Sequence, residues 1–587
     1  MFIVNQPQQC RGELCSPEFR AAITKRAAAA LNTPVPDLTI SDCLEFTRTG
    51  NRVNFEAKYF ARRHQLNDLV MAEYITGSSE YLEQIINIVW KINEESGWQL
   101  PAHNTYIRDT VQNPLPDPFR PVLDLFACET AASIALTNHL LGGEMEKIAP
   151  GIQKRILSEL EHRIIQPYLT THFWWMGNGP EQMCNWTPWC TKNILIVTAL
   201  TPQTDETQQT IHKKAGYSLE CFLKGYGEDG CCDEGAKYYG HAALCLYTAM
   251  ELLGSDFSSN KIRNIADYIR QVHVSGDYYI NFADCPPILE PPGVLAFLFG
   301  KRTNNPDLQA FAAEGIKRRG LHTPSNDLSL YTRLLTLFSI NEITQFKHTP
   351  KPPRDKYFDS VGMLVARDER TNLAVKAGGN GDNHNHNDTG SVTLYFDGKP
   401  FLIDVGVGSY TRETFSDKRY TIWTMQSVYH NLPTFNGIMQ GHGAEYRAKD
   451  VRYDIGSEET WISMDIAGAY PPEASVSRYK RTVRLAKGTG VYISDEYEGR
   501  YPAELSLMFS ELPAINAGTA NIRVDEITID DPVLLNVWQN KLYRVVVTFT
   551  DRITVFLSVE CGGWSVELKS ENVHTPRHCG LVPQSAV

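Results

Sequence analysis

The chain has 587 residues, which is enough for more than one domain at about 100–200 residues per domain. Hydrophobic residues make up 42% and charged residues 21% of the sequence, which is typical of an ordered globular protein and excludes a disordered or collagen-like one. The formal net charge is −12, so there is no overall basic field. We therefore expect no nucleic-acid partner and no binding to an anionic membrane surface.

The sequence also bears on location. No apolar run approaches the roughly 20 residues that a membrane-spanning helix needs, so we expect no membrane partner. Met1–Gln9 lacks the basic segment and the long apolar core of a signal peptide, which favours a cytoplasmic location for the chain as given. A periplasmic or secreted location stays open if the chain has been trimmed. Most of the 13 cysteines stand singly among apolar residues, a pattern that favours reduced thiols.

Apolar residues recur at helical spacing from about Phe55 to about Ile343. Ile85, Ile88 and Ile92, for example, fall on one face of a helix. The same spacing predicts helices over Leu66–Ile75, Tyr81–Ile92, Val122–Leu141, Gly151–Leu169, Trp189–Leu200, Ile211–Phe222, Ala236–Leu253, Ile262–Val272, Leu308–Lys317 and Asn326–Leu337. Successive antiparallel helix pairs with short connections must curl to cover their inner faces, which predicts a solenoid or an (α/α) toroid.

The pattern changes at a proline-rich stretch, Lys347–Pro353, which cannot form a helix and reads as a linker. After it the apolar period becomes two, and several strand pairs flank short turns. These hairpins are Ser391–Phe396 with Pro400–Val405, Arg481–Leu485 with Gly490–Ser494, and Arg544–Thr550 with Ile553–Val559. Many strands without intervening helices predict an antiparallel β-sandwich.

We therefore expect a multidomain chain in which an all-α domain is followed by an all-β domain. We predict an all-α toroid domain over residues 1–346, a proline-rich linker over 347–356 and an antiparallel β-sandwich over 357–587. A cleft is expected where the two domains meet.

The densest polar cluster is Asn380–Asp388, which runs into a predicted strand. If this segment is extended, His384 and His386 lie on one side of it, where they can share a metal or divide into one ligand and one catalytic base. Asp404 and His430 are further candidate ligands, because two histidines and one aspartate are the usual protein ligands of zinc when a fourth position stays open. The alternative interpretation is a solvated loop whose side chains cap turns.

A second metal hypothesis uses the same region. His386 and Asp388 with His430 match the two-histidine, one-carboxylate triad of non-haem iron oxygenases. Such an enzyme is built on a single barrel and has no evident use for a large helical domain.

Tryptophans gather in the helical half. The segments Phe173–Gly179 and Asn185–Cys190 contain four of the ten tryptophans. Such clusters are often core plugs, but on loops at the rim of a toroid their indole faces can stack on sugar rings, and we favour this second interpretation.

A second loop precedes the predicted helix Ala236–Leu253. It places Asp233 and Glu234 near the start of that helix, where acids complement the helix dipole. Tyr238 and Tyr239 follow one turn later and could project into the same cleft.

Several of these motifs occur in the order found in the heparinase II/III-type polysaccharide lyases, a family that includes oligoalginate lyases. The chain resembles this family from about Asn54 to about Gly437. The matching motifs are Glu94-Glu95-x-x-Trp98 with Pro101-Ala102-His103, Asn185-Trp186 with Trp189-Cys190, Glu234-Gly235-x-x-Tyr238, His384-x-His386-x-Asp388, Asp404-x-Gly406 and His430-Asn431.

This resemblance implies an enzyme that cleaves uronic-acid-containing glycosaminoglycans, of heparan sulfate, hyaluronan or chondroitin type, by β-elimination to unsaturated oligosaccharides. It implies an N-terminal incomplete (α/α) toroid followed by a C-terminal antiparallel β-sandwich. Asn185 would neutralise the uronate carboxylate, Tyr238 would act as the catalytic acid and also as a candidate base, and His384 would be the second catalytic or neutralising residue. The implied substrate is an anionic polysaccharide or oligosaccharide.

The resemblance also implies binding residues. Substrate contacts are expected from Trp186, Trp189, His103, Glu234 and Tyr239, with Tyr239 as the alternative to Tyr238. The implied ligands of one zinc ion are His386, Asp404 and His430, with Asp388 as the alternative to Asp404. The ion is expected to be structural or to shape the site, because β-elimination needs no metal-activated water.

The sequence departs from the family at two places that bear on subsite preference. Cys184 stands where a second asparagine is common, and Cys231-Cys232 fills a loop that is usually glycine-rich.

Other functions stay open at this stage. An oligoalginate lyase would share the fold. A toroid glycoside hydrolase would need two separated carboxylates, for which the adjacent Asp233 and Glu234 are poorly placed. A carbohydrate-binding protein with a structural zinc is the non-enzymatic alternative. The uronate polymer and its sulfation, endo or exo action, and the oligomeric state, with a homo-oligomer as one option, are not determined by the sequence.

Overall fold

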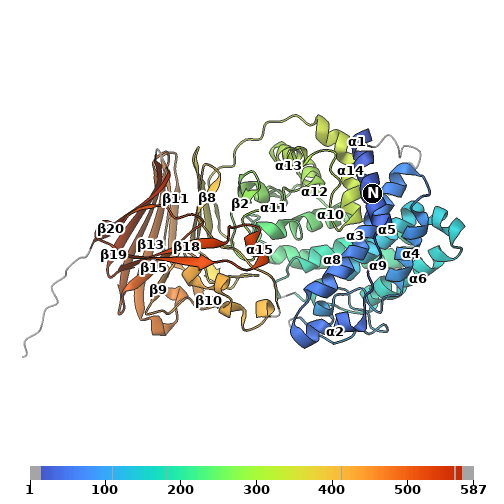
Figure 1. Ribbon diagram of the computed structural model, residues 1–587, viewed down its shortest axis with the longest axis horizontal. Coiled ribbons are helices and arrows are strands. Elements are labelled where there is room, and N and C mark those ends of the chain that lie inside the picture. The colour runs from blue at the N-terminus through green and yellow to red at the C-terminus, as the bar shows by residue number, and fades with distance from the viewer. Residues whose placement is uncertain (1–14, 109, 180, 412, 561–562, 572–587) are drawn as a thin grey trace, which may run out of the picture. The chain divides into compact units, whose positions relative to one another are not determined.

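A computed structural model of the chain describes residues 15–571 apart from 109, 180, 412 and 561–562, so the terminus Met1–Gln9 lies outside the described residues. The internal contacts divide the chain into two compact units (Figure 1). The helical unit comprises the described residues of Met1–His273, Ile288–Pro353 and Tyr410–Arg419, and the β unit comprises those of Val274–Pro287, Arg354–Ser409 and Tyr420–Val587. Two short segments, Val274–Pro287 and Tyr410–Arg419, are therefore each part of a different unit from the residues that precede and follow them in the sequence.

The helical unit is built from amphipathic helices, most of which the apolar spacing predicts. Ile85, Ile88 and Ile92 are fully buried on one face of their helix, as expected from the sequence. None of the described helices is long and apolar enough to cross a membrane. The helices are α1 (Pro17–Leu31), α2 (Ile40–Thr49), α3 (Val53–Thr76), α4 (Leu82–Asn93), α5 (Leu125–Ile148), α6 (Ile152–Leu160), α7 (Gln166–Thr170), α8 (Trp186–Leu200), α9 (Asp205–Gly225), α10 (Ala243–Leu253), α11 (Asn260–Gln271), α12 (Val294–Arg302), α13 (Pro306–Arg319) and α14 (Leu330–Gln345).

The predicted helix Ala236–Leu253 is wrong in its first part. Residues Ala236–Tyr239 form a short 3₁₀ turn, and the α-helix begins only at Ala243. Gly235 lies in the left-handed region at φ 90° and Gly240 follows the turn, so glycines, which favour helix poorly, stand on both sides of it. Asp233 and Glu234 therefore do not precede an α-helix, and the helix-dipole interpretation of these acids is wrong.

The β unit contains two large sheets. One is a 9-stranded sheet ordered β17–β18–β15–β8–β7–β5–β4–β3, with β9 also paired to β15, and the other is a 7-stranded sheet ordered β11–β12–β13–β14–β19–β20–β16. A small sheet pairs β10 with β6, and two short strands, β1 and β2, pair with each other. The pairings within the large sheets are antiparallel except for β16 with β20.

The strand bounds follow in the order of each sheet. The first large sheet contains β17 (Asn521–Thr528), β18 (Lys541–Phe549), β15 (Ala503–Phe509), β8 (Lys399–Leu402), β7 (Val392–Phe396), β5 (Thr371–Lys376), β4 (Met363–Arg367), β3 (Lys356–Phe358) and β9 (Pro433–Phe435). The second contains β11 (Lys449–Ile455), β12 (Glu459–Asp465), β13 (Val476–Ala486), β14 (Gly490–Gly499), β19 (Arg552–Glu560), β20 (Gly563–Glu571) and β16 (Ala514–Asn516). The short ones are β1 (His273–Ser275), β2 (Tyr278–Tyr279), β6 (Gly379–Asn380) and β10 (Gly443–Arg447), and a short helix, α15 (Pro532–Leu535), also lies in this unit.

One hydrophobic core joins the two large sheets. It contains Leu373 and Leu394 from the first sheet and Val483 and Ile493 from the second, all at most 1% exposed. Sheets that share a core through their inner faces are packed as the two layers of a sandwich. A helical half followed by an antiparallel β half confirms the predicted fold class.

Two of the three predicted hairpins are confirmed. Strand β7 pairs with β8, with Phe396 opposite Lys399, and β13 pairs with β14, with Ala486 opposite Gly490. The third is wrong, because β18 pairs with β15 and β17 in one sheet whereas β19 pairs with β14 and β20 in the other. Alternating apolar residues predict a strand but not its partner, and the short Thr550-Asp551 connection leads from one sheet to the other.

A fully buried ion pair ties the second sheet to loops of the first. Arg481 on β13 donates from Nε and Nη2 to the two carboxylate oxygens of Asp495 on β14, at 2.9 and 2.7 Å. Its third nitrogen, Nη1, donates to the backbone carbonyls of Gly390 and Asn431, at 2.7 and 2.8 Å. The guanidinium therefore holds the chain immediately before β7 and immediately after His430.

We predict that Arg481→Met lowers the free energy of unfolding of the β unit by about 3–5 kcal/mol, because Asp495 is left as a buried charge without its partner. The measurement is the urea midpoint of the β-unit transition. Arg484→Met, on the same strand but in a partly exposed pair with Glu459, should change it by less than about 1 kcal/mol. Equal effects of the two substitutions would contradict the assigned role of Arg481.

Candidate functional site

In the helical unit, the start of α8 is held by a carboxylate from another segment. Asn185 is the residue that caps α8, but its own side chain does not cap the helix. Instead Glu234 accepts from the Asn185 backbone N–H at 3.1 Å and from its side-chain Nδ2 at 2.5 Å. Both residues are buried, so Glu234 satisfies the helix start and fixes the orientation of the Asn185 amide.

The 3₁₀ turn that follows Glu234 presents Tyr238. Its side chain is 8% exposed, and its hydroxyl lies 2.8 Å from the hydroxyl of Tyr410, a residue of the helical unit although it follows β8 in sequence. The Lys237 ammonium lies over both rings, 5.9 Å from the Tyr238 centroid and 5.4 Å from that of Tyr410. The two phenols therefore form a hydrogen-bonded pair beside a cation.

Tyr239, the alternative to Tyr238, has a different environment. It is 1% exposed, and its hydroxyl donates to the backbone carbonyl of Ala266 at 2.8 Å. These contacts assign Tyr239 to packing between the turn and α11, and its contact with substrate stays a prediction that this geometry does not favour.

The predicted aromatic residues form one connected group, because Phe126 contacts both His103 and Trp189, with centroids 6.0 and 5.6 Å apart. Trp189 is stacked on His241, with centroids 4.6 Å apart, and donates its indole N–H to Glu129 at 2.8 Å. Trp186 lies edge-on to His103 at 4.8 Å and packs against Trp174 at 5.0 Å. The indoles of Trp186 and Trp189 are half-buried, which leaves part of each side chain accessible.

Glu129 on α5 organises the second layer behind Trp189. One of its carboxylate oxygens accepts from Trp189, Lys192 and Asn193, at 2.8, 3.1 and 2.8 Å. Burial by itself would raise the pKa of Glu129, but the Lys192 ammonium and these donors lower it overall, so the group is ionised. No motif marked Glu129, because it lies inside an apolar stretch of α5.

His241 is the neutral member of this group. Burial, together with the nearby Lys237 and Lys192 ammonium groups, lowers the pKa of His241 to about 4. The ring is uncharged near neutral pH, and it also lies edge-on to Tyr238, with centroids 5.9 Å apart. His241 therefore connects Trp189 to Tyr238 through ring contacts.

In the β unit, the predicted polar segment is a turn and not an extended strand. His384 lies in the left-handed region at φ 53°, so the expectation that His384 and His386 lie on one side of an extended chain is wrong. Both imidazoles instead contact one carboxylate, that of Asp284, which is fully buried: His384 Nδ1 lies 2.8 Å from Oδ2, and His386 Nε2 lies 3.0 Å from Oδ1.

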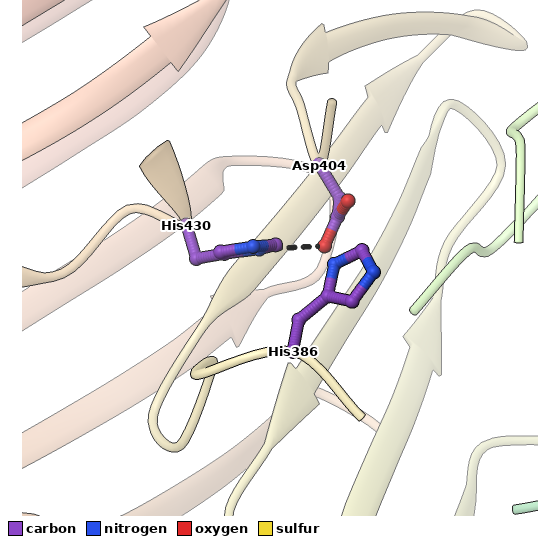
Figure 2. Close-up of side chains that lie close together, drawn as sticks. All are labelled: His386, Asp404 and His430. Atoms are coloured by element: carbon purple, nitrogen blue, oxygen red, sulfur yellow. Dashed lines mark hydrogen bonds and ion pairs between the residues drawn. The ribbon is translucent and has the colours of Figure 1, made fainter. Parts of the chain in front are cut away.

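The β unit brings together the three residues proposed as zinc ligands. His386, Asp404 and His430 are buried, and one ligand atom of each lies within 4.8 Å of the others. Figure 2 shows the His386 ring directed toward the Asp404 carboxylate and the His430 ring in line with it. They come from the turn before β7, the end of β8 and the residue after a 3₁₀ turn, Ser427–Tyr429.

The hydrogen bonds of this group suit a cation. His430 Nε2 donates to the Thr424 carbonyl at 2.9 Å, so in the neutral ring Nδ1 has no proton, yet it faces Asp404 Oδ2 at 2.9 Å. Burial by itself would lower the pKa of His430, but the Asp404 carboxylate raises that pKa overall. A proton or a metal ion must therefore lie between His430 Nδ1 and Asp404 Oδ2. His386 Nδ1 is buried without a hydrogen-bond partner. Two imidazole nitrogens and a carboxylate are therefore available to one zinc ion.

Asp388 does not join this group. It accepts from the buried Lys376 ammonium at 2.8 Å, and Lys376 also lies 3.4 Å from Asp382. Asp388 is not a member of the group formed by His386, Asp404 and His430. Its role as the alternative zinc ligand and the iron triad of His386, Asp388 and His430 stay predictions that this geometry does not favour.

Comparison with known proteins relates one part of the chain to a protein family. Residues 350–571 match the family described as heparinase II/III-like, C-terminal. This domain belongs to that family. The resemblance to the heparinase II/III-type polysaccharide lyases is thereby confirmed, and no curated protein sequence matches the chain.

Solved structures share the fold over most of the chain. Heparinase III is 14% identical, covers 97% of this chain and 91% of its own, and has a TM-score of 0.58. A mutant of the heparan sulfate lyase HepC from Pedobacter heparinus is 14% identical, covers 94% of this chain and 83% of its own, and has a TM-score of 0.56. At this identity the matches show the fold alone, and they are consistent with a toroid followed by a sandwich.

The lowered pKa of His241 predicts that acid destabilises the helical unit. The unfolded chain binds a proton at the ordinary pKa of 6.5 and the folded chain only at about 4, so stability falls as the pH decreases through this window. His241→Gln should therefore lose less stability than the wild type between about pH 7 and pH 5, as measured by urea midpoints. His162→Gln, at an exposed position, should keep the wild-type pH dependence. The same slope in His241→Gln and the wild type would refute this.

Proposed function

We propose that the protein cleaves uronic-acid-containing glycosaminoglycans, of heparan sulfate, hyaluronan or chondroitin type, by β-elimination. One observation carries the proposal: the start of α8 and the segment 234–241 contact each other through Asn185 with Glu234 and through Trp189 with His241. Within one unit these contacts hold an amide, a phenol and partly accessible indoles. The family of the C-terminal domain and the fold similarity to heparan sulfate lyase support the same activity.

β-Elimination places definite demands on these groups. A base removes the proton from C5 of the uronate, the C4–O4 bond breaks, a C4–C5 double bond forms, and the leaving O4 takes up a proton. Negative charge builds up on the uronate carboxyl group as the C5 proton leaves, so hydrogen-bond donors must stabilise it. Asn185 can serve here, because Glu234 engages one amide hydrogen and fixes the direction of the other.

Proton transfer is assigned to Tyr238 and His384. The Tyr238 phenol donates to the leaving O4, and the Tyr410 hydroxyl at 2.8 Å is its partner for proton exchange. The base for C5 is either the His384 imidazole or the Tyr238 phenolate, which on taking the C5 proton becomes the phenol that donates to O4. Trp186 and Trp189 offer half-buried indole faces on which a sugar ring can stack.

We further propose that His386, Asp404 and His430 hold one zinc ion. Bound there, zinc supplies positive charge that neutralises Asp404 and holds the loops together. The reaction itself is assigned to side chains, because β-elimination activates no water molecule. The turn that carries His386 also carries His384, so the ligands help to position the proposed catalytic imidazole.

We predict that the protein generates the ultraviolet absorbance of a conjugated C4–C5 double bond from one or more of heparan sulfate, hyaluronan and chondroitin sulfate, each tested separately beside alginate. Tyr238→Phe should lower kcat by about 10²–10⁴-fold, because proton transfer is lost while the ring remains. Tyr217→Phe, an exposed tyrosine of α9, is the matched control and should keep wild-type kinetics.

Each result of this assay has a distinct meaning. Absorbance with alginate alone would replace the glycosaminoglycan assignment by an oligoalginate lyase. New reducing ends without absorbance would indicate a hydrolase, and binding without either signal would indicate a carbohydrate-binding protein. A Tyr238→Phe variant as active as Tyr217→Phe would remove Tyr238 from the mechanism.

We predict about one zinc ion per chain, by elemental analysis of protein dialysed against a weak chelator. His386→Ala and His430→Ala should each lose most of this zinc, since each removes an imidazole donor. His442→Ala, at an exposed histidine of the same unit, should retain it. Zinc that stays bound in both ligand variants would place the ion elsewhere.

A further inference from the structure

The inference begins with a segment that belongs to the β unit although helices precede and follow it in sequence. Val274–Pro287 lies between α11 and α12 but is part of the β unit. Tyr395 on β7 donates its hydroxyl to the carbonyl of Tyr279, at 3.0 Å. Asn281 donates its side-chain amide to the carbonyl of Asp404, at 3.3 Å. The segment is therefore fixed against β7 and the end of β8, beside the three proposed zinc ligands.

A close backbone approach at Gly406 fixes the same segment. Gly406 has φ 80°, and a Cβ at this position would lie 3.1 Å from the carbonyl oxygen of Cys285. A side chain here would be strained by the backbone conformation and would crowd that carbonyl. The residue next to Cys285 is Asp284, so this contact sets where the Asp284 carboxylate lies.

The Asp284 carboxylate is shared between two histidines with different proposed roles. It is fully buried, with Oδ2 2.8 Å from Nδ1 of His384 and Oδ1 3.0 Å from Nε2 of His386. An ionised carboxylate only accepts hydrogen bonds, so each ring presents an N–H to it. In the neutral rings the lone pairs then lie at His384 Nε2 and His386 Nδ1.

These lone pairs are the ones that the proposed chemistry needs. His386 Nδ1 is the atom within the His386, Asp404 and His430 group, and it is otherwise without a partner. His384 is partly exposed, with 19% of its side chain accessible, which suits the catalytic role proposed for this ring. The left-handed backbone at His384, φ 53°, is a conformation that needs support from surrounding contacts.

We propose that Asp284 is a positioning residue that sets the tautomers of His384 and His386 together and thereby couples the proposed catalytic imidazole to the zinc group. The coupling rests on the function and the zinc ligands proposed above. Zinc at His386 orders the Asp284 carboxylate, and the ordered carboxylate holds His384 with Nε2 as its proton acceptor. Loss of the carboxylate weakens zinc binding and slows turnover through a residue that touches neither zinc nor substrate.

Asparagine is the informative replacement because it has the shape of aspartate but only one acceptor. In Asp284→Asn, one histidine faces an oxygen and the other faces an NH₂ group, so one ring must change its tautomer or turn. The expected result is about a 10–100-fold weaker zinc affinity, measured by competition with a chromophoric chelator, as for loss of other hydrogen-bond partners of metal ligands. We also expect a lower kcat with KM changed less than about twofold, because positioning and not binding is lost.

The matched control is Asp277→Asn, which makes the same chemical change at an exposed position of the same segment. It should leave both zinc affinity and kcat at the wild-type value. Asp284→Asn with zinc affinity and kcat both unchanged would overturn the coupling. So would a lower kcat without any loss of zinc affinity, and so would a wild-type protein that takes up no zinc.

A second variant covers the case in which Asp284→Asn does not fold. His384→Gln removes one of the two hydrogen bonds to Asp284 without removing a proposed zinc ligand. If the carboxylate couples the two histidines, His384→Gln weakens zinc affinity at least threefold, and unchanged affinity overturns the proposal. Because the zinc measurements need no substrate, a wild-type protein that cleaves none of the polymers refutes the lyase activity, whereas the zinc affinities still decide the coupling.

Discussion

The site in the β unit is arranged around carboxylates that cannot stay ionised inside a protein without donors or cations. Asp404 is buried just after β8, where the Gly406 backbone N–H donates to it and His430 Nδ1 lies 2.9 Å from its Oδ2. Asp284 is buried beside it and is satisfied by two histidines. Each carboxylate thus draws in residues that are far away in the sequence. The imidazoles of His384, His386 and His430 lie at this place because they stabilise the buried carboxylates of Asp284 and Asp404.

The same requirement explains how the framework is connected to the site. The buried Arg481 guanidinium, neutralised by Asp495, has donors left over for the carbonyls of Gly390 and Asn431. Asn431 in turn bonds the carbonyls of Val392 and Ile403 and accepts from the Met508 N–H. The loops next to His386, Asp404 and His430 are thereby held in place by the side chain of Arg481, on β13, and by that of Asn431. Such support suits loops whose histidines must keep a defined orientation.

In the helical unit, a comparable layer holds the groups that we propose for carboxylate neutralisation and sugar stacking. Glu234 orients Asn185, and Glu129 orients Trp189 through its indole N–H. Two buried anions thus position a neutral amide and an aromatic ring, which are suited to a substrate that itself carries negative charge. Under the proposed function a uronate would meet donors and ring faces here, while the carboxylates are engaged by the protein.

The sequence by itself determined the class of fold, two of the three hairpins and the candidate residues, because periodicity and motif spacing are local properties. Apolar residues at helical and then at alternating spacing report which face of each element is buried, whatever lies against it. Only the tertiary structure decided the partner of β19, the break at Gly240, the choice of Asp404 over Asp388 beside His386, and the place of Asp284. These features depend on contacts between residues that are far apart in the sequence. Lys376 pairs with Asp388, and the segment Val274–Pro287 brings Asp284 into the β unit, and no local pattern in the sequence records either contact.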